Sequence, residues 1–134
     1  MFTVSKEIHF CYGHRLLNHQ GKCRHLHGHN ATAAIRLESD ELDELGMVCD
    51  FTDIGNYVKA WLIAELDHNM LLHEDDPILP SLQQAGERVY VMDRNPTAEN
   101  IARLIFDYVA DGGFPVVEVV IYETDSALAS YRRD

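Results

Sequence analysis

Two histidines separated by one glycine, His27 and His29, are the residues best suited to chemistry in this sequence. Side chains alternate between the two faces of an extended strand, so both imidazoles point the same way and can take two corners of a tetrahedral metal site. His14 is the expected third ligand because it ends the preceding strand. Three histidines leave the fourth position of zinc open, as in catalytic sites. A hydrogen-bonded histidine pair without metal is the alternative.

The segment around these histidines differs in charge from the rest of the chain. Lys and Arg number 11 against 22 Asp and Glu, a formal net charge of −11, which argues against general binding to nucleic acids or anionic membranes. Residues 8–37 nevertheless contain no acidic residue, and they carry six of the eight histidines together with Arg15, Lys22, Arg24 and Arg36. The segment therefore suits an anionic ligand, unless the clustering is chance.

A thiol precedes the histidine pair at Cys23, between Lys22 and Arg24. Neighbouring cations stabilise a thiolate, which suits proton abstraction or nucleophilic attack. Cys23 could instead be a fourth zinc ligand that closes the site, or a buried and inert thiol. The spacing alone does not separate these three roles.

Two acidic residues lie where a partner is expected. Asp67 precedes His68, and a carboxylate beside a histidine can orient the ring or raise its basicity, although a solvated helix end is the simpler explanation. Glu123 ends an apolar strand face, where acids are rare without a partner. Two parallel N–H donors on a guanidinium-like ligand edge would satisfy both of its oxygens. An ion pair with Arg36 or Arg132 is the alternative.

A small α+β domain must position these residues. With 134 residues, the chain is expected to form a single domain over residues 1–134, with helices on one face of a largely antiparallel sheet. Open sheet edges favour oligomerisation. Periodicity and turn signals predict strands over 2–10, 27–38, 46–51, 88–92, 116–124 and 127–133, a helix capped by Thr52 and running to about Leu66, and a helix opened by Asn95-Pro96-Thr97 and running to about Ala110.

Three other features of the sequence indicate a cytoplasmic protein. No apolar stretch is long enough to span a membrane, and the N-terminus lacks the features of a secretory signal. The three cysteines, Cys11, Cys23 and Cys49, cannot all pair, and their spacing indicates no disulfide framework. A reducing compartment is therefore expected.

Taken in order, six segments resemble the 6-pyruvoyl-tetrahydropterin synthase family, which includes the bacterial 6-carboxytetrahydropterin synthases of queuosine biosynthesis. The likeness covers nearly the whole chain. Phe10–Leu16 is similar to F-x-A-x-H-R-L, Cys23–His29 to C-x-x-x-H-G-H, Asp50-Phe51 to D-F, Leu66–Leu71 to L-D-H-x-x-L, Asn95–Asn100 to N-P-T-x-E-N, and Tyr122–Thr124 to x-E-T.

The resemblance implies a fold and an assembly. The fold is the tunnelling fold (T-fold), expected here as a four-stranded antiparallel sheet with two helices on one face and a small insert hairpin. Subunits of the family form barrel trimers that pair into hexamers, with sites between subunits. The chain is therefore expected to be a homo-oligomer that binds a small molecule.

The resemblance also assigns roles to residues. It implies that His14, His27 and His29 hold zinc and that Cys23 is the general base. His68, with Asp67 behind it, is then the partner of that thiol. On the substrate side, it implies that Glu123 grips the amino-pyrimidine edge of a pterin, and the binding residues include Thr97 and Glu99. The basic residues Arg15, Lys22 and Arg24 are expected near a triphosphate.

The implied reaction is that of a zinc-dependent lyase acting on 7,8-dihydroneopterin triphosphate. The carboxy branch cleaves the side chain to give 6-carboxy-5,6,7,8-tetrahydropterin and acetaldehyde, and it is favoured over the pyruvoyl branch, which keeps the side chain as a diketone. Two other functions remain as alternatives. One is a non-catalytic pterin- or metal-binding paralogue, and the other is a zinc hydrolase, which would need a carboxylate beside the metal.

Three departures from the family pattern put substrate preference in doubt. Cys11-Tyr12-Gly13 replaces the small residues usual before the first zinc histidine. Leu72 stands where asparagine is frequent. An insert lies between Leu72 and Asn95, and it contains Asp75, Asp76, Pro77 and Pro80.

Overall fold

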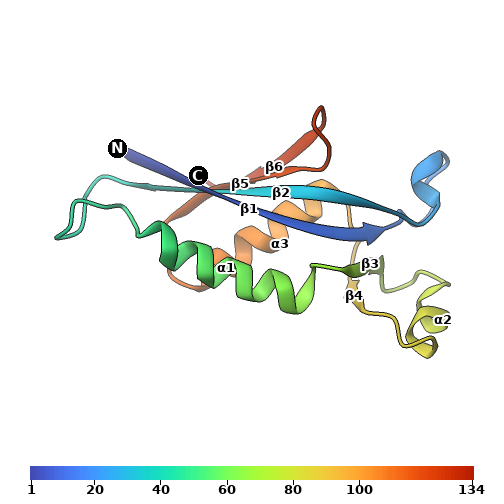
Figure 1. Ribbon diagram of the computed structural model, residues 1–134. Helices are drawn as coiled ribbons and strands as arrows, with labels where there is room; N and C mark the ends of the chain where they lie inside the picture. Colours follow the sequence, from blue (N-terminus) through green and yellow to red (C-terminus); the bar gives the residue numbers. More distant parts are fainter.

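A long antiparallel pair of strands forms the centre of the fold (Figure 1). The computed structural model describes all 134 residues. Strand β1 (Phe2–His14) pairs with β2 (His27–Ser39) in continuous register, from Phe2 opposite Ser39 to His14 opposite His27. This register places the first histidine of the predicted metal site directly across from the second.

The sheet has six strands rather than the expected four, in the order β4-β3-β1-β2-β5-β6. Strands β5 (Val116–Tyr122) and β6 (Leu128–Arg132) extend it antiparallel on one side, whereas β3 (Asn69–His73) and β4 (Val89–Met92) extend it parallel to β1 on the other. The sheet is therefore mixed, and the class remains α+β.

The strand predicted over residues 46–51 is absent. Gly46 has a positive φ of 83°, and Asp43 holds a turn by accepting hydrogen bonds from the amides of Gly46, through its carbonyl, and Met47, through its side chain. The apolar residues of this segment therefore reach the core from a turn and are not part of a β-strand. Val48 and Cys49 are partly buried against the core.

Two long helices cover one face of the sheet, as expected (Figure 1). Helix α1 (Phe51–Glu65) is capped by the side chain of Asp50, which accepts from the Thr52 amide at 2.8 Å, so the cap lies two residues before the predicted one. Helix α3 (Ala98–Asp111) is capped by Thr97, whose hydroxyl accepts from the Asn100 amide at 3.1 Å. A core of 20 buried residues joins the inner faces of the strands to both helices.

The insert forms a parallel crossover and not the hairpin expected from the sequence. The chain leaves β3, forms the short helix α2 (Leu79–Gln84), and returns in β4, whose residues pair in parallel with β3 from Met70 opposite Val89 to His73 opposite Met92. A single 3-10 turn, η1 (Lys22–Arg24), completes the elements. None of the helices combines the length and apolar character needed to cross a membrane.

Candidate functional site

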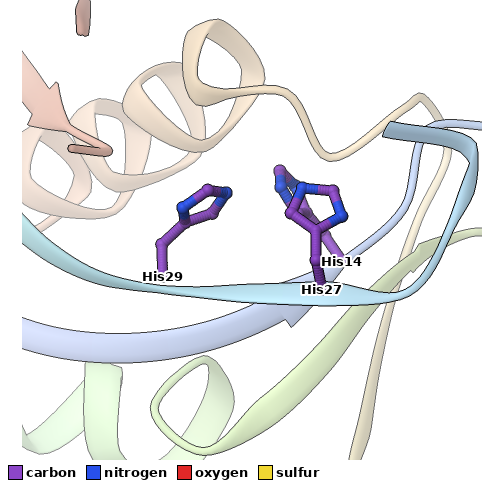
Figure 2. Close-up of side chains that lie close together, drawn as sticks. All are labelled: His14, His27 and His29. Carbon is purple, nitrogen blue, oxygen red and sulfur yellow. The ribbon is translucent and has the colours of Figure 1, made fainter. Parts of the chain in front are cut away.

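His14, His27 and His29 converge above the end of the central strand pair (Figure 2). One ring nitrogen of each lies within 4.8 Å of the others. The ring centroids of His14 and His27 are 4.5 Å apart, and His29 lies 5.1 Å from each. The pairing of β1 with β2 creates this arrangement, because it sets His14 opposite His27 while strand alternation turns His29 to the same face.

Backbone carbonyls fix the tautomers of two of these rings. His14 Nδ1 lies 2.7 Å from the Pro96 carbonyl, and His27 Nδ1 lies 2.7 Å from the His25 carbonyl. Because a carbonyl oxygen only accepts, each Nδ1 carries the proton and donates it, which leaves the lone pair on Nε2. Outward hydrogen bonds of this kind orient histidines that bind metals.

The inward nitrogens have no hydrogen-bond partner. Nε2 of His14 and Nε2 of His29 are buried and unpaired, which is costly unless something else satisfies them. Burial also lowers the pKa of His14 below its ordinary value, which favours the neutral form that binds metals. Three converging imidazoles, two of them with a buried and unpaired Nε2, therefore fit a divalent metal ion.

Glu123 reaches the histidines from the end of β5. Its Oε1 lies 3.5 Å from Nε2 of both His14 and His29, and it accepts a hydrogen bond of 2.9 Å from the Tyr12 hydroxyl. The arginine pairing considered from the sequence does not occur at Arg36, which contacts Glu38 and Glu118 instead. The partner of Glu123 within the chain is Tyr12.

Tyr12 is the site residue that the sequence reasoning missed. It is 2% exposed and lies edge-on to His14 with ring centroids 5.1 Å apart. Burial, and then the charge of Glu123, raises the pKa of its hydroxyl, so it remains a hydrogen-bond donor. The signal was its strand parity, because Phe10, Tyr12 and His14 share one face of β1.

Cys23 lies in η1, half-buried, and its thiol does not join the cluster formed by the three histidine nitrogens. Its carbonyl accepts from the Leu16 amide at 2.8 Å, which ties the turn to the residues that follow His14. This arrangement disfavours the fourth-ligand alternative.

Asp67 and His68 form the expected pair, with 2.8 Å between Asp67 Oδ2 and His68 Nδ1. The thiol beside the pair is Cys11, whose Sγ lies 3.5 Å from the same nitrogen, and not Cys23 as expected. Cys11 and His14 have opposite parity on β1, so within one chain this pair lies on the other face from the three-histidine centre.

Backbone geometry fixes Asp67 and His68 against β1. The Cys11 amide donates to Asp67 Oδ1 at 2.9 Å, and the His68 amide donates to the Cys11 carbonyl at 2.8 Å. His68 has a φ of 59°, in the left-handed region that non-glycine residues rarely adopt. Although burial raises the pKa of Asp67, the hydrogen bonds from Cys11 and His68 bring it below its ordinary value.

Arg15 was expected near a triphosphate, but it forms an ion pair with Asp76 instead. Its guanidinium donates from Nε and Nη2 to both oxygens of Asp76, at 2.8 and 2.5 Å, and the Asp76 side chain is 1% exposed. The hydrogen bond from Arg15 holds the pKa of Asp76 below its usual range. The insert therefore neutralises this basic residue, and Lys22 and Arg24 remain exposed near Cys23.

The Asn95–Asn100 segment mainly shapes the loop beside His14. The Asn95 side chain exchanges hydrogen bonds with the amide and carbonyl of Leu17, at 2.8 and 3.0 Å, and Asn100 donates to the Asn95 carbonyl at 2.8 Å. The Thr97 hydroxyl is used in capping α3. Glu99 is exposed in the first turn of that helix.

The chain is similar to known proteins along nearly its whole length. The family model described as 6-pyruvoyl tetrahydropterin synthase matches residues 3–134. A 6-carboxy-5,6,7,8-tetrahydropterin synthase from Rickettsia typhi is 38% identical over 133 residues, covering 94% of this chain and 96% of the relative. Another from Aquifex aeolicus is 30% identical, covering 99% of each chain.

Two solved structures share the fold. An uncharacterized protein from Wolinella succinogenes superposes with a TM-score of 0.84 at 27% identity, covering 99% of this chain and 98% of the other. The 6-pyruvoyl tetrahydropterin synthase of Caenorhabditis elegans superposes with a TM-score of 0.72 at 21% identity, covering 99% and 96%. At 21% identity, the similarity to the second structure supports only a shared fold.

Proposed function

This chain belongs to the 6-pyruvoyl tetrahydropterin synthase family, and from that premise we propose that it is a zinc-dependent lyase converting 7,8-dihydroneopterin triphosphate to 6-carboxy-5,6,7,8-tetrahydropterin, acetaldehyde and triphosphate. The relatives named for the carboxy product, which match over more than nine-tenths of the chain, support this branch. The observation that carries the proposal is the convergence of three histidines with two orphaned, buried Nε2 atoms.

His14, His27 and His29 would hold the zinc ion. Three nitrogen ligands with an open fourth position are the donor set of catalytic zinc. When bound, zinc supplies Lewis-acid chemistry, which polarises substrate oxygens and makes the adjacent C–H bonds more acidic. The carbonyls of Pro96 and His25 orient two of the ligands and keep their inward lone pairs free.

Cys23 removes a proton from the substrate side chain and His68 returns one, while Asp67 orients the His68 ring. In one chain His68 contacts Cys11 and not Cys23. A second copy of the chain must therefore supply His68 to a site that contains Cys23. This requirement supports an oligomer, as trimer or dimer of trimers, and the outer strands β4 and β6 provide open edges for assembly.

Glu123 binds the amino-pyrimidine edge of the pterin. Tyr12 already occupies Oε1, so the hydroxyl holds the carboxylate in place and leaves Oε2 for the ligand. Thr97 and Glu99 border the site at the start of α3. Lys22 and Arg24, exposed beside Cys23, meet the triphosphate, and Arg15 does not because Asp76 neutralises it.

The three cysteines are free thiols, which suits a reducing cytoplasm. We place the enzyme there on this ground. Its substrate is a small molecule, and the net charge of −11 disfavours nucleic acid as a partner.

A zinc hydrolase is the second candidate function, because one observation favours it. Glu123 brings a carboxylate within 3.5 Å of two of the ligand nitrogens, which is the group that such an enzyme needs beside its metal. Hydrolysis would release phosphate while leaving the three-carbon side chain of the pterin intact. The products therefore separate the two functions.

The test is incubation of the purified, zinc-loaded protein with 7,8-dihydroneopterin triphosphate, followed by assays for acetaldehyde, triphosphate and the pterin product. Acetaldehyde with triphosphate establishes the carboxy branch. Triphosphate without acetaldehyde indicates the pyruvoyl branch, and stepwise phosphate release with an intact side chain indicates the hydrolase. If the protein holds one zinc ion per chain but does not convert the substrate, it is a non-catalytic binding paralogue.

A further inference from the structure

A second group of metal-binding side chains lies apart from the three histidines. The ligand atoms of Cys11, Asp67 and His68 all lie within 4.8 Å of one another. Cys11 lies near the C-terminal end of β1, and the other two form the turn that leads into β3. No role in the proposed reaction requires the Cys11 thiol.

We propose that these three side chains form a second metal site, which takes a thiophilic divalent cation such as zinc on the face of β1 opposite the histidine centre. The ligands are Cys11 Sγ, His68 Nδ1 and Asp67 Oδ2, with water in the fourth position. Thiolate, imidazole and carboxylate are all ordinary zinc ligands. Binding breaks the S–H bond of Cys11, and the thiol proton is released to solvent. The proton that His68 Nδ1 donates to Asp67 moves to Nε2, which frees the Nδ1 lone pair for the ion.

The distances fit a shared ion. A tetrahedral zinc with ordinary bond lengths sets a sulfur and a nitrogen ligand about 3.6 Å apart, and a nitrogen and an oxygen about 3.4 Å apart. Cys11 Sγ and His68 Nδ1 are 3.5 Å apart, so this pair needs no adjustment. His68 Nδ1 and Asp67 Oδ2 are 2.8 Å apart in the metal-free hydrogen bond, so they must separate slightly.

The surroundings permit that adjustment and give the ion access. Within one chain the His68 side chain is 70% exposed and its ring can move, while its amide stays bonded to the Cys11 carbonyl. The other oxygen of Asp67, Oδ1, accepts from the Cys11 amide, which leaves Oδ2 for the ion. Cys11 and His68 both line a surface pocket of about 530 Å³.

Occupancy of this site has a consequence that rests on the proposed function. An ion on Nδ1 of His68 displaces Asp67 from that nitrogen and fixes the ring, so His68 can no longer return a proton. Zinc in excess of the catalytic equivalent would then inhibit turnover. The two metal sites would have opposite effects on one enzyme.

The direct experiment uses Co²⁺ as the probe and needs no substrate. Metal-free full-length protein is titrated with Co²⁺, and the thiolate-to-cobalt charge-transfer band is followed in the near ultraviolet. We expect two equivalents in the wild type, with the band growing only with the second equivalent, because the first site has nitrogen ligands alone. A single equivalent without the band would overturn the proposal.

Cysteine variants assign the band. Cys11→Ser should lose the band and the second equivalent while keeping the first, whereas Cys23→Ser and Cys49→Ser, matched controls at the other two thiols, should keep the band. His14→Ala should lose the first equivalent and keep the second. A band that survives Cys11→Ser, or disappears in Cys23→Ser, contradicts the assignment.

A second variant guards against a folding defect in Cys11→Ser. His68→Gln changes an exposed side chain, and it should also lose the second equivalent while its circular dichroism spectrum stays that of the wild type. Retention of the second equivalent in folded His68→Gln contradicts the site. The activity assay tests the inhibitory effect. Turnover with excess zinc, divided by turnover without it, should fall below one in the wild type and stay near one in Cys11→Ser. The cobalt titration needs no lyase activity, so it tests the second metal site even if the proposed function is wrong.

Discussion

The two groups of candidate metal ligands lie on opposite faces of β1 and differ in how their polar atoms are satisfied. In the histidine centre, His14 is 3% exposed and its inward nitrogen has no partner. In the Cys11–Asp67–His68 group, the His68 side chain is 70% exposed and its ring nitrogen already bonds to Asp67. The first group therefore gains a missing interaction when a metal binds, whereas the second must give up a hydrogen bond.

This difference explains why the two groups suit different chemistry. A largely buried site with prearranged nitrogens favours a bound metal, because leaving those nitrogens unpaired is costly. A solvated carboxylate–histidine pair keeps its ring free to exchange protons, and it binds a metal only in competition with its own hydrogen bond. The affinity for metal should therefore be higher on the histidine face.

The largest effect should come from removing a ligand on the histidine face. In His27→Ala, bound zinc should fall from about one per chain to none, and turnover should drop on the order of 10⁴-fold, because Lewis-acid assistance is lost. Metal analysis and steady-state kinetics measure both. His25→Ala is the matched control, since His25 is exposed and only its carbonyl contacts His27. A fully active, metal-free His27→Ala would contradict the mechanism.

Replacing the two thiols in turn sharpens the comparison between the faces. Cys23→Ala should lower kcat by about 10³-fold, the scale of a missing general base, while zinc remains at about one per chain. Cys11→Ala should retain most of the activity, because the backbone groups of Cys11 make the main contacts with Asp67 and His68. Loss of zinc in Cys23→Ala would instead make Cys23 a ligand, and equal defects in both variants would remove the distinction.

Glu123 should act on substrate binding more than on chemistry. In Glu123→Ala we expect KM to rise by about 10-fold to 100-fold, the range for a lost hydrogen bond to a charged group, while zinc is retained. Tyr12→Phe should raise KM only a few-fold, since it removes the hydroxyl that holds Oε1 and leaves the carboxylate. An unchanged KM in Glu123→Ala would remove its assigned role.

The smallest effect concerns stability and the ion pair that joins the histidine end of β1 to the insert. Arg15 follows His14, and Asp76 follows β3, so their contact ties the histidine end of β1 to the insert. In Asp76→Asn the free energy of unfolding at pH 7 should fall by about 1–2 kcal/mol, below the usual cost of breaking a fully buried pair because Arg15 is 22% exposed.

The pH dependence of unfolding has a definite sign. The pKa of Asp76 is lowered in the folded protein, so its contribution to stability is complete above the ordinary carboxyl pKa and disappears as pH falls through the folded value. Urea unfolding at pH 7 and pH 3 should therefore show a smaller acid-induced loss in Asp76→Asn than in the wild type. Equal losses would contradict the ion pair.

Predictions from the sequence were accurate where short-range periodicity governs structure. Strand alternation placed His27 and His29 on one buried face, and the structure brings them together with His14. The helices α1 and α3 also follow their apolar spacing and lie within two residues of the expected ends. These features depend on residues that are close to one another in the sequence.

The two misses among the strands have different causes, one local and one distant. The predicted strand at residues 46–51 is a turn because Asp43 satisfies its amides locally. β3 was overlooked because its five residues lack a clear alternating pattern, and they become a strand by pairing in parallel with the end of β1. For β3, therefore, the short segment itself carries no strong signal.

By itself, the sequence determined the α+β class and the shared face of His27 and His29, because side-chain alternation along a strand follows from covalent geometry. The register of β1 on β2 then brought His14 to them. Only the tertiary structure decided that Tyr12 holds Glu123, that Asp76 neutralises Arg15, and that Cys11 lies beside His68. These partners are separated by 111, 61 and 57 positions in the sequence. Contacts at such separations depend on strand order and register across the whole sheet, which no short segment specifies.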